Sequence, residues 1–184
     1  DVEDGQHVVV MCSGQGYIKR TALDEFSNIR STGIIAVTIE DGDQLIDARL
    51  TNGKQQIMLT SAQGMSIRFT ASDEALRPMG RSTSGVIGMH FRGDDRLLEA
   101  SVVSDEGYVF VVTEGGYAKR TSADQYRLQN RGGLGIKVAK LSDYVGILKG
   151  MQRGDMMGAL GRYGLDMMSY GQVATAWGAK MAAD

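Results

Sequence analysis

The chain of 184 residues carries 20 lysines and arginines against 22 aspartates and glutamates, which gives a formal net charge of −2. This near-balance excludes a strongly cationic nucleic-acid-binding domain but is compatible with a local basic stripe. The single cysteine, Cys12, excludes an internal disulfide and a cysteine-rich zinc site, and no apolar run approaches the roughly 20 residues of a membrane span. Twenty-five glycines and one proline favour tight turns over long helices. We expect a β-rich cytoplasmic protein whose sequence, lacking an initiator methionine, begins inside a longer chain.

Three apolar, β-prone runs are each followed by a glycine-containing turn and a block of alternating side chains. The runs are residues 8–11, 57–60 and 109–112, and the blocks are residues 16–21, 64–69 and 116–121. This order is typical of a β-hairpin. The arginines of the three blocks, Arg20, Arg68 and Arg120, are spaced 48 and 52 residues apart. We predict that they occupy equivalent positions in successive hairpins.

A second element follows each block and opens a further short strand, at Arg30, Arg81 and Arg131. After the first two copies comes an acidic turn and another apolar run, at residues 41–46 and 93–98. Each repeat therefore has about 50 residues and roughly four short strands, the size of a propeller-like blade. We predict repeats at residues 5–50, 51–100 and 101–150, and a degenerate fourth repeat at residues 151–184.

Other features have simpler interpretations. Residues 73–77 are helix-compatible but stop at Pro78, which predicts a one-turn connector. The acidic residues near positions 43 and 95 recur in two repeats, which favours turn chemistry over cation binding. Cys12 lies in an apolar run and is expected in the core. His7 and His90 have no companions at ligand spacing, so we expect neither a metal site nor a catalytic group.

The repeated blocks, and the stretch at residues 73–86, resemble the C-terminal domain of DNA gyrase A. Residues 129–135 are similar to that family's box, QRRGGKG, but depart from it at Asn130 and Leu134. The resemblance implies an all-β fold, a β-pinwheel of four-stranded blades with strand exchange between neighbours. This chain would form a fragment of one such domain, with about three complete blades and a degenerate one.

The resemblance also implies a function, non-sequence-specific binding and wrapping of double-stranded DNA in support of negative supercoiling by a bacterial type II topoisomerase. The implied partners are DNA, the rest of the gyrase A protein, and gyrase B in a heterotetramer. The catalytic tyrosine and the ATP site, with its Mg²⁺, belong to other parts of the parent isomerase. We therefore expect this chain to need no cofactor and to be non-catalytic alone. Two alternatives stay open: the equivalent C-terminal domain of topoisomerase IV, and a propeller-like protein-interaction module without a DNA role.

Basic residues recurring once per repeat would space charges evenly along a bent duplex, which requires neutralised phosphates but no contact with base edges. The predicted DNA-binding residues are Lys19, Arg20, Arg30, Arg68, Arg81, Lys119, Arg120, Arg131 and Lys137. The box-like motif comprises Gln129, Asn130, Arg131, Gly132, Gly133, Leu134 and Gly135. Its glycines would let the backbone approach a phosphate, or would simply close the blade.

Overall fold

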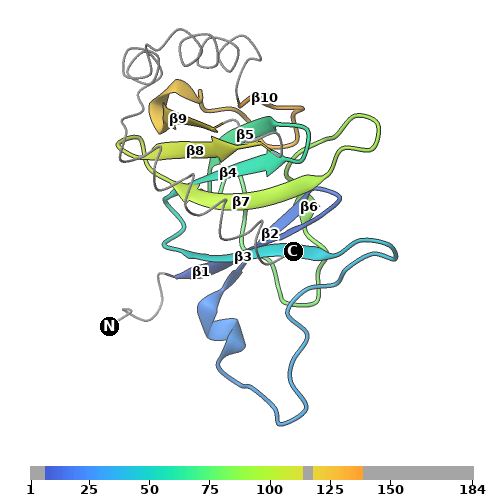
Figure 1. Ribbon diagram of the computed structural model, residues 1–184. Coiled ribbons are helices and arrows are strands. Elements are labelled where there is room, and N and C mark those ends of the chain that lie inside the picture. The colour runs from blue at the N-terminus through green and yellow to red at the C-terminus, as the bar shows by residue number, and fades with distance from the viewer. Residues whose placement is uncertain (1–6, 114–117, 139–184) are drawn as a thin grey trace, which may run out of the picture. The chain divides into compact units, whose positions relative to one another are not determined.

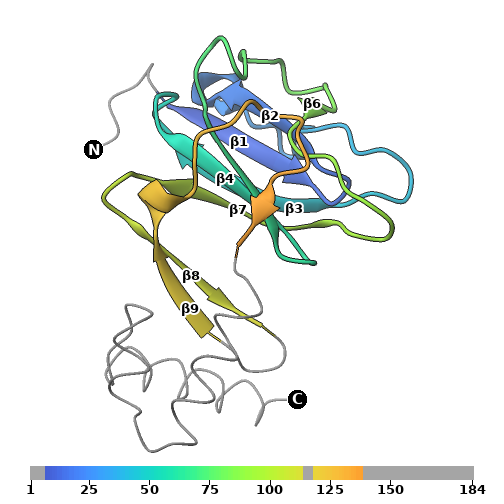
Figure 2. The same cartoon turned by 90° about the horizontal axis from the view of Figure 1, so that it is seen from above.

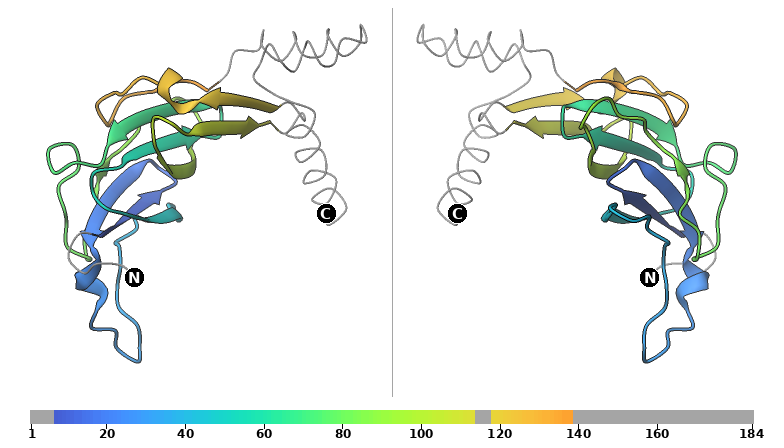
Figure 3. Two further views of the ribbon diagram at one scale, coloured as in Figure 1. Left: turned by 90° about the vertical axis from the view of Figure 1, so that its left-hand side faces the viewer. Right: turned by 90° about the vertical axis from the view of Figure 1, so that its right-hand side faces the viewer.

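The computed structural model describes residues 7–113 and 118–138, and almost every regular element in these ranges is a strand. In chain order the strands are β1 (Val8–Ser13), β2 (Tyr17–Ala22), β3 (Leu45–Thr51), β4 (Gln56–Ser61), β5 (Met65–Thr70), β6 (Val86–Ile87), β7 (Leu97–Val103), β8 (Tyr108–Val112), β9 (Ala118–Ser122) and β10 (Ile136–Lys137) (Figure 1). Two 3₁₀-helices, η1 (Leu23–Phe26) and η2 (Ala123–Gln125), follow β2 and β9. The long segment after η1 leaves the sheet and returns to it as β3 (Figure 3).

The chain divides into two compact units. The first comprises residues 1–104 and 126–137, and the second comprises residues 105–125 and 138–184. Of the described strands, β1 to β7 and β10 belong to the first unit, whereas β8 and β9 belong to the second. The predicted fourth repeat at residues 151–184 lies outside the described residues, and the predicted repeat boundaries stay predictions.

The first unit contains two antiparallel four-stranded sheets, with strand orders β3-β1-β2-β6 and β10-β5-β4-β7. In each sheet a hairpin pairs on one side with the next long strand of the chain, β3 on β1 and β7 on β4. On its other side it pairs with a short strand from the following predicted repeat, β6 on β2 and β10 on β5 (Figures 1 and 2). This topology is the strand exchange expected of a pinwheel.

The hairpin register confirms that Arg20, Arg68 and Arg120 are equivalent. Arg20 lies opposite Val10, Arg68 opposite Met58, and Arg120 opposite Phe110. The third of these hairpins, β8 with β9, belongs to the second unit, where the Arg120 guanidinium lies 4.4 Å from the centre of the Tyr108 ring.

The hydrophobic core of the first unit explains why its inner strands are continuous apolar runs. β1 and β4 are covered on both faces, so buried side chains do not alternate along them. The core cluster comprises Val10, Cys12, Ile18, Ile57, Leu59, Ile67, Phe69, Ala71, Leu76, Met89, Leu97 and Ala100. Cys12 is 1% exposed, which confirms its predicted core position.

Two further sequence predictions are confirmed. The Asp43 carboxylate accepts hydrogen bonds from the backbone N–H groups of Gln15 and Gln44, and Asp95 makes the equivalent pair of contacts in the second repeat, as turn chemistry predicts. The connector after β5 makes one turn, with the Leu76 N–H donating to the Ser72 carbonyl, before the chain reaches Pro78.

Candidate nucleic-acid interface

The exposed edge of each sheet in the first unit is formed by a segment exchanged from the following repeat. We call residues 77–87 and 127–137 the rim segments. Each first meets an outer strand through an isolated bridge, Pro78 with Arg20 and Leu128 with Arg68. Each then pairs with the same strand as β6 or β10. The rim segments therefore lie along residues 17–20 of β2 and residues 65–68 of β5.

The opposite edges of the two sheets face each other. On β3, the Arg49 Nε donates to the Ala100 carbonyl at 3.0 Å, and the Asp47 carboxylate accepts from the Ala100 N–H at 3.3 Å. The two rim segments also meet, because the Arg131 guanidinium donates to the Ile87 carbonyl at 3.0 Å. The rim segments thus lie at the opposite edge of each sheet from β3 and β7, and they meet each other although residues 88–126 separate them in the chain.

A close backbone approach holds each rim segment against its outer strand. Gly85 has φ +99° and Gly135 has φ +74°, a left-handed conformation that glycine adopts without penalty. A Cβ atom at Gly85 would lie 2.5 Å from the Ile18 carbonyl oxygen, and one at Gly135 would lie 2.3 Å from the Ser66 carbonyl oxygen. No larger residue fits at either position without displacing the strand.

Lys19 lies in β2 with its side chain fully buried, and its ammonium group donates to the carbonyls of Ala36, Gly80, Arg81 and Thr83. Burial lowers the pKa of Lys19, and the charge of Arg81 lowers it further. An ammonium enclosed in this way does not extend to a phosphate outside the protein. Its position therefore does not fit the DNA contact predicted for it.

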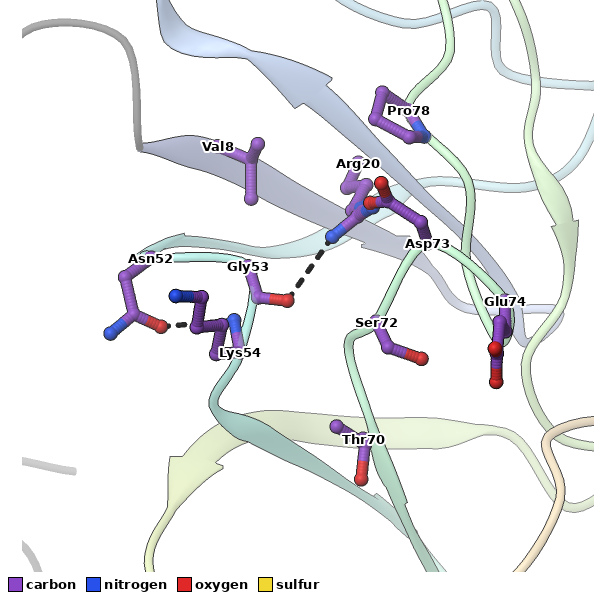
Figure 4. A pocket seen from close by; sticks show the side chains of 10 residues that line it. All are labelled: Val8, Arg20, Asn52, Gly53, Lys54, Thr70, Ser72, Asp73, Glu74 and Pro78. Atoms are coloured by element: carbon purple, nitrogen blue, oxygen red, sulfur yellow. Dashed lines mark hydrogen bonds and ion pairs between the residues drawn. The ribbon is translucent and has the colours of Figure 1, made fainter.

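Arg20 and Arg68 are also buried and hold the connectors that lead into the rim segments. The Arg20 guanidinium donates to the Ala71 carbonyl. It also donates to the Gly53 carbonyl and forms an ion pair with Asp73, both of which lie beside it in Figure 4. Burial lowers its pKa. The equivalent Arg68 donates to the Tyr126 carbonyl at 2.9 Å and to the Gln56 side chain. For both arginines, internal hydrogen bonds take the place of the predicted phosphate contacts.

Arg81 and Arg131 are half-buried, and each donates hydrogen bonds to backbone carbonyls of a segment earlier in the chain. Arg131 donates to the carbonyls of Ala75 at 2.6 Å and Ile87 at 3.0 Å. Arg81 likewise donates to the Ile35 carbonyl at 3.2 Å. Within the box-like motif the observed contacts are those of blade closure, since Gly133 also accepts from the backbone N–H of His90. Phosphate contact by this motif stays a prediction.

Four of the predicted cations are placed differently. Arg30 and Lys137 are exposed, and Lys137 lies in a rim segment. Lys119 and Arg120 are half-buried in β9 of the second unit. The Arg120 guanidinium packs on the face of Tyr108, a cation–π arrangement that holds it at the hairpin.

Two exposed arginines, Arg77 and Arg127, were not among the predicted DNA-binding residues. Each is the first residue of a rim segment and immediately precedes the residue that bridges to the outer strand. They are 50 residues apart, the same offset that relates Arg81 to Arg131. Extending the repeat alignment by four positions upstream of Arg81 and Arg131 would have found them.

Neither a metal centre nor a membrane span is found in the part of the chain that the structure describes. No three His, Cys, Asp or Glu side chains there are grouped to hold a metal ion. No helix in those residues is long and apolar enough to cross a membrane.

Comparison with known proteins decides the family. The family model of the DNA gyrase C-terminal domain, described as a β-propeller, matches three times, at residues 7–52, 55–104 and 107–153. The chain belongs to this family. It is 47% identical over 158 residues to the A subunit of DNA gyrase from Mycolicibacterium smegmatis and 48% identical over 157 residues to that from Streptomyces coelicolor. These alignments cover 86% and 83% of this chain but only 18% and 17% of those relatives, so the chain spans less than a fifth of their length.

Solved structures agree with this membership. A DNA gyrase A C-terminal domain aligns with a TM-score of 0.65 at 25% identity, covering 76% of this chain and 47% of that one. The C-terminal domain of DNA topoisomerase IV aligns with a TM-score of 0.68 at 21% identity, covering 74% and 43%, and shows the shared fold alone. The predicted pinwheel fold and the resemblance to the gyrase A C-terminal domain are therefore confirmed.

Proposed function

We propose that this chain binds double-stranded DNA without sequence specificity and bends it along the rim segments. In this proposal the chain is the DNA-wrapping part of a DNA gyrase A protein and supports negative supercoiling. The observation that carries it is the pair Arg77 and Arg127, exposed at equivalent positions of two consecutive rim segments. Exposed Lys137 lies in the second of these segments, and the exposed Arg30 aligns with Arg81 and Arg131 in the first repeat.

The way the rim segments are held favours this function. Cations at regular intervals neutralise successive phosphates of a bent duplex and need not contact base edges. The cost of bending DNA is offset only by contacts that the protein holds in place. Here the buried Arg20 and Arg68 fix the start of each segment, and the glycine approaches fix its end.

The wider assembly belongs to the same proposal. We infer that the chain works with the remainder of a gyrase A protein and with gyrase B, in the cytoplasm of a bacterium. ATP hydrolysis, Mg²⁺ and strand cleavage would be supplied by those other parts, and this chain would be non-catalytic by itself. The sequence relatives favour gyrase over topoisomerase IV, whose likeness here is one of fold.

Salt dependence of binding to a linear duplex tests the proposal. If Arg30, Arg77, Arg127 and Lys137 contact about four phosphates, log affinity should fall with log salt at a slope of about −4. Affinity would then drop by about 250-fold between roughly 50 and 200 mM salt. Replacing Arg77 and Arg127 together with alanine should flatten the slope by about two and weaken all duplex sequences alike.

Lys54→Ala is the matched control, because Lys54 is exposed but lies in the loop between β3 and β4, outside the rim segments. It should leave the slope nearly unchanged. Binding that ignores salt, or an Arg77→Ala/Arg127→Ala variant that binds like the unaltered chain, would contradict the proposal. A protein-interaction module without a DNA role predicts no salt-dependent binding at all.

A further inference from the structure

The environment of the Lys19 ammonium is that of a bound cation. Its Nζ lies 2.6 to 3.1 Å from four carbonyl oxygens, one more acceptor than its three N–H groups require. We call the carbonyls of residues 36, 80, 81 and 83 the carbonyl cage. None of its members is a carboxylate, so the charge is held by backbone dipoles that replace the hydration shell, as in carbonyl-lined potassium sites.

The second repeat shows that the fold does not require a cation at this position. Lys19 lies opposite Met11 in its hairpin, and the residue in the same register of the next hairpin is Ile67, opposite Leu59. Ile67 is also fully buried and lies close to the following rim segment, with its Cδ1 3.4 Å from where a Cβ on Gly133 would be. An aliphatic side chain therefore serves in one repeat where an ammonium serves in the other.

The cage exists because the backbone of residues 35–38 lies against rim segment 77–87. The Thr38 hydroxyl donates to the Ser82 carbonyl at 3.0 Å, and the Thr38 N–H donates to the Thr83 carbonyl at 3.3 Å. The Arg81 guanidinium also donates to the Ile35 carbonyl at 3.2 Å. These contacts bring the Ala36 carbonyl to the three rim carbonyls, so that four negative dipole ends converge on one point.

We propose that the carbonyl cage is a monovalent-cation site that the protein fills with its own Lys19 ammonium, and that filling it fixes rim segment 77–87 for DNA binding. Lys19 is then a positioning residue and not a phosphate contact. Ammonium and potassium ions are close in size and prefer the same carbonyl ligands, so either can replace the missing charge when Lys19 is removed. The DNA-binding part of this inference rests on the proposed function, whereas the cage itself does not.

Thermal unfolding in two salts tests the cage. Lys19→Met removes the ammonium and keeps an unbranched side chain, and in sodium chloride its midpoint should fall by about 4 °C or more. In ammonium chloride of equal concentration at least half of that loss should be recovered. The unaltered chain and the exposed-lysine control Lys54→Met should have the same midpoint in both salts.

Two results would overturn the cage: a Lys19→Met midpoint equal to that of the unaltered chain, or a loss that ammonium does not reduce. Lys19→Gln keeps amide donors without the charge and serves if Lys19→Met folds in neither salt. It must show the same ammonium-dependent gain.

The salt slope of DNA binding separates positioning from contact. Lys19→Met should weaken binding roughly threefold or more in sodium chloride with an unchanged slope, whereas Lys137→Met should flatten the slope by about one. A slope flattened by about one in Lys19→Met would make Lys19 a phosphate contact and overturn the inference. If the unaltered chain does not bind DNA, the proposed function fails and thermal unfolding alone decides the cage.

Discussion

The glycine that ends each rim segment allows a sharp test of how the blades are closed. In Gly135→Ala, the new Cβ would lie 2.3 Å from the Ser66 carbonyl oxygen and 2.7 Å from its carbonyl carbon, both backbone atoms of β5. Neither can move without breaking the pairing of β10 with β5. Gly93 has a similar left-handed φ of +60°, but a Cβ there would meet nothing within 4 Å. Gly93→Ala therefore shares the backbone strain and lacks the collision.

The difference between the two variants isolates the collision. Left-handed backbone costs a non-glycine residue about 1 to 2 kcal/mol, and this contribution is common to both. Overpacking against fixed backbone adds about 1 to 3 kcal/mol in Gly135→Ala alone. For a chain of this size, that difference corresponds to a thermal midpoint lower by about 2 to 12 °C than that of Gly93→Ala.

Circular dichroism melts of both variants and of the unaltered chain measure this difference. Gly85→Ala should behave like Gly135→Ala, because its Cβ would lie 2.5 Å from the Ile18 carbonyl oxygen in the preceding sheet. Equal midpoints for Gly93→Ala and Gly135→Ala would refute the argument that the rim segments are held by a backbone approach that only glycine permits.

Two further predictions concern single side chains. Burial, and secondarily the charge of Asp47, raises the pKa of Cys12. At pH 8 iodoacetamide should therefore alkylate the folded chain far more slowly than the unfolded one, as followed by mass spectrometry, and rapid labelling of the folded chain would contradict this. Glu74 is an exposed carboxylate three residues before Arg77, so Glu74→Gln should raise DNA affinity about twofold at low salt and less at high salt. In the same titration Asp41→Asn, in a turn outside the rim segments, is the control, and an equal gain from both would exclude a local effect.

The repeated pattern was sufficient to predict the hairpins and their equivalence. An apolar run, a glycine turn and an alternating block are local features, and the register of a hairpin follows from its turn. This is why Arg20 and Arg68 were correctly placed at matching positions. The turn roles of Asp43 and Asp95 were predicted for the same reason, since each carboxylate accepts from the N–H of the next residue in its own turn.

The candidate site was predicted only in part, because exposure is not a local property. Lys19, Arg20 and Arg68 were expected to contact DNA because basic residues recur once per repeat and because of the family resemblance, and contact of this kind requires side chains that are exposed to solvent. Their burial depends on a rim segment, for Lys19, and on the connectors before the rim segments, for the two arginines, which lie about 50 to 60 residues further along the chain. Arg77 was missed because no repeated block contains it, and its exposure at the rim follows from the bridge of Pro78 to β2.

The sequence by itself determined the family, the repeat period and the paired strands, because each of these is encoded within a stretch of about 50 residues. Tertiary structure alone decided which cations are internal and which are exposed. Strand exchange adds a segment from the next repeat to one edge of each of the first two hairpins, and that segment covers some side chains and presents others to solvent. A buried charge persists only where carbonyls or a carboxylate replace its water, and those partners are brought together only in the folded chain.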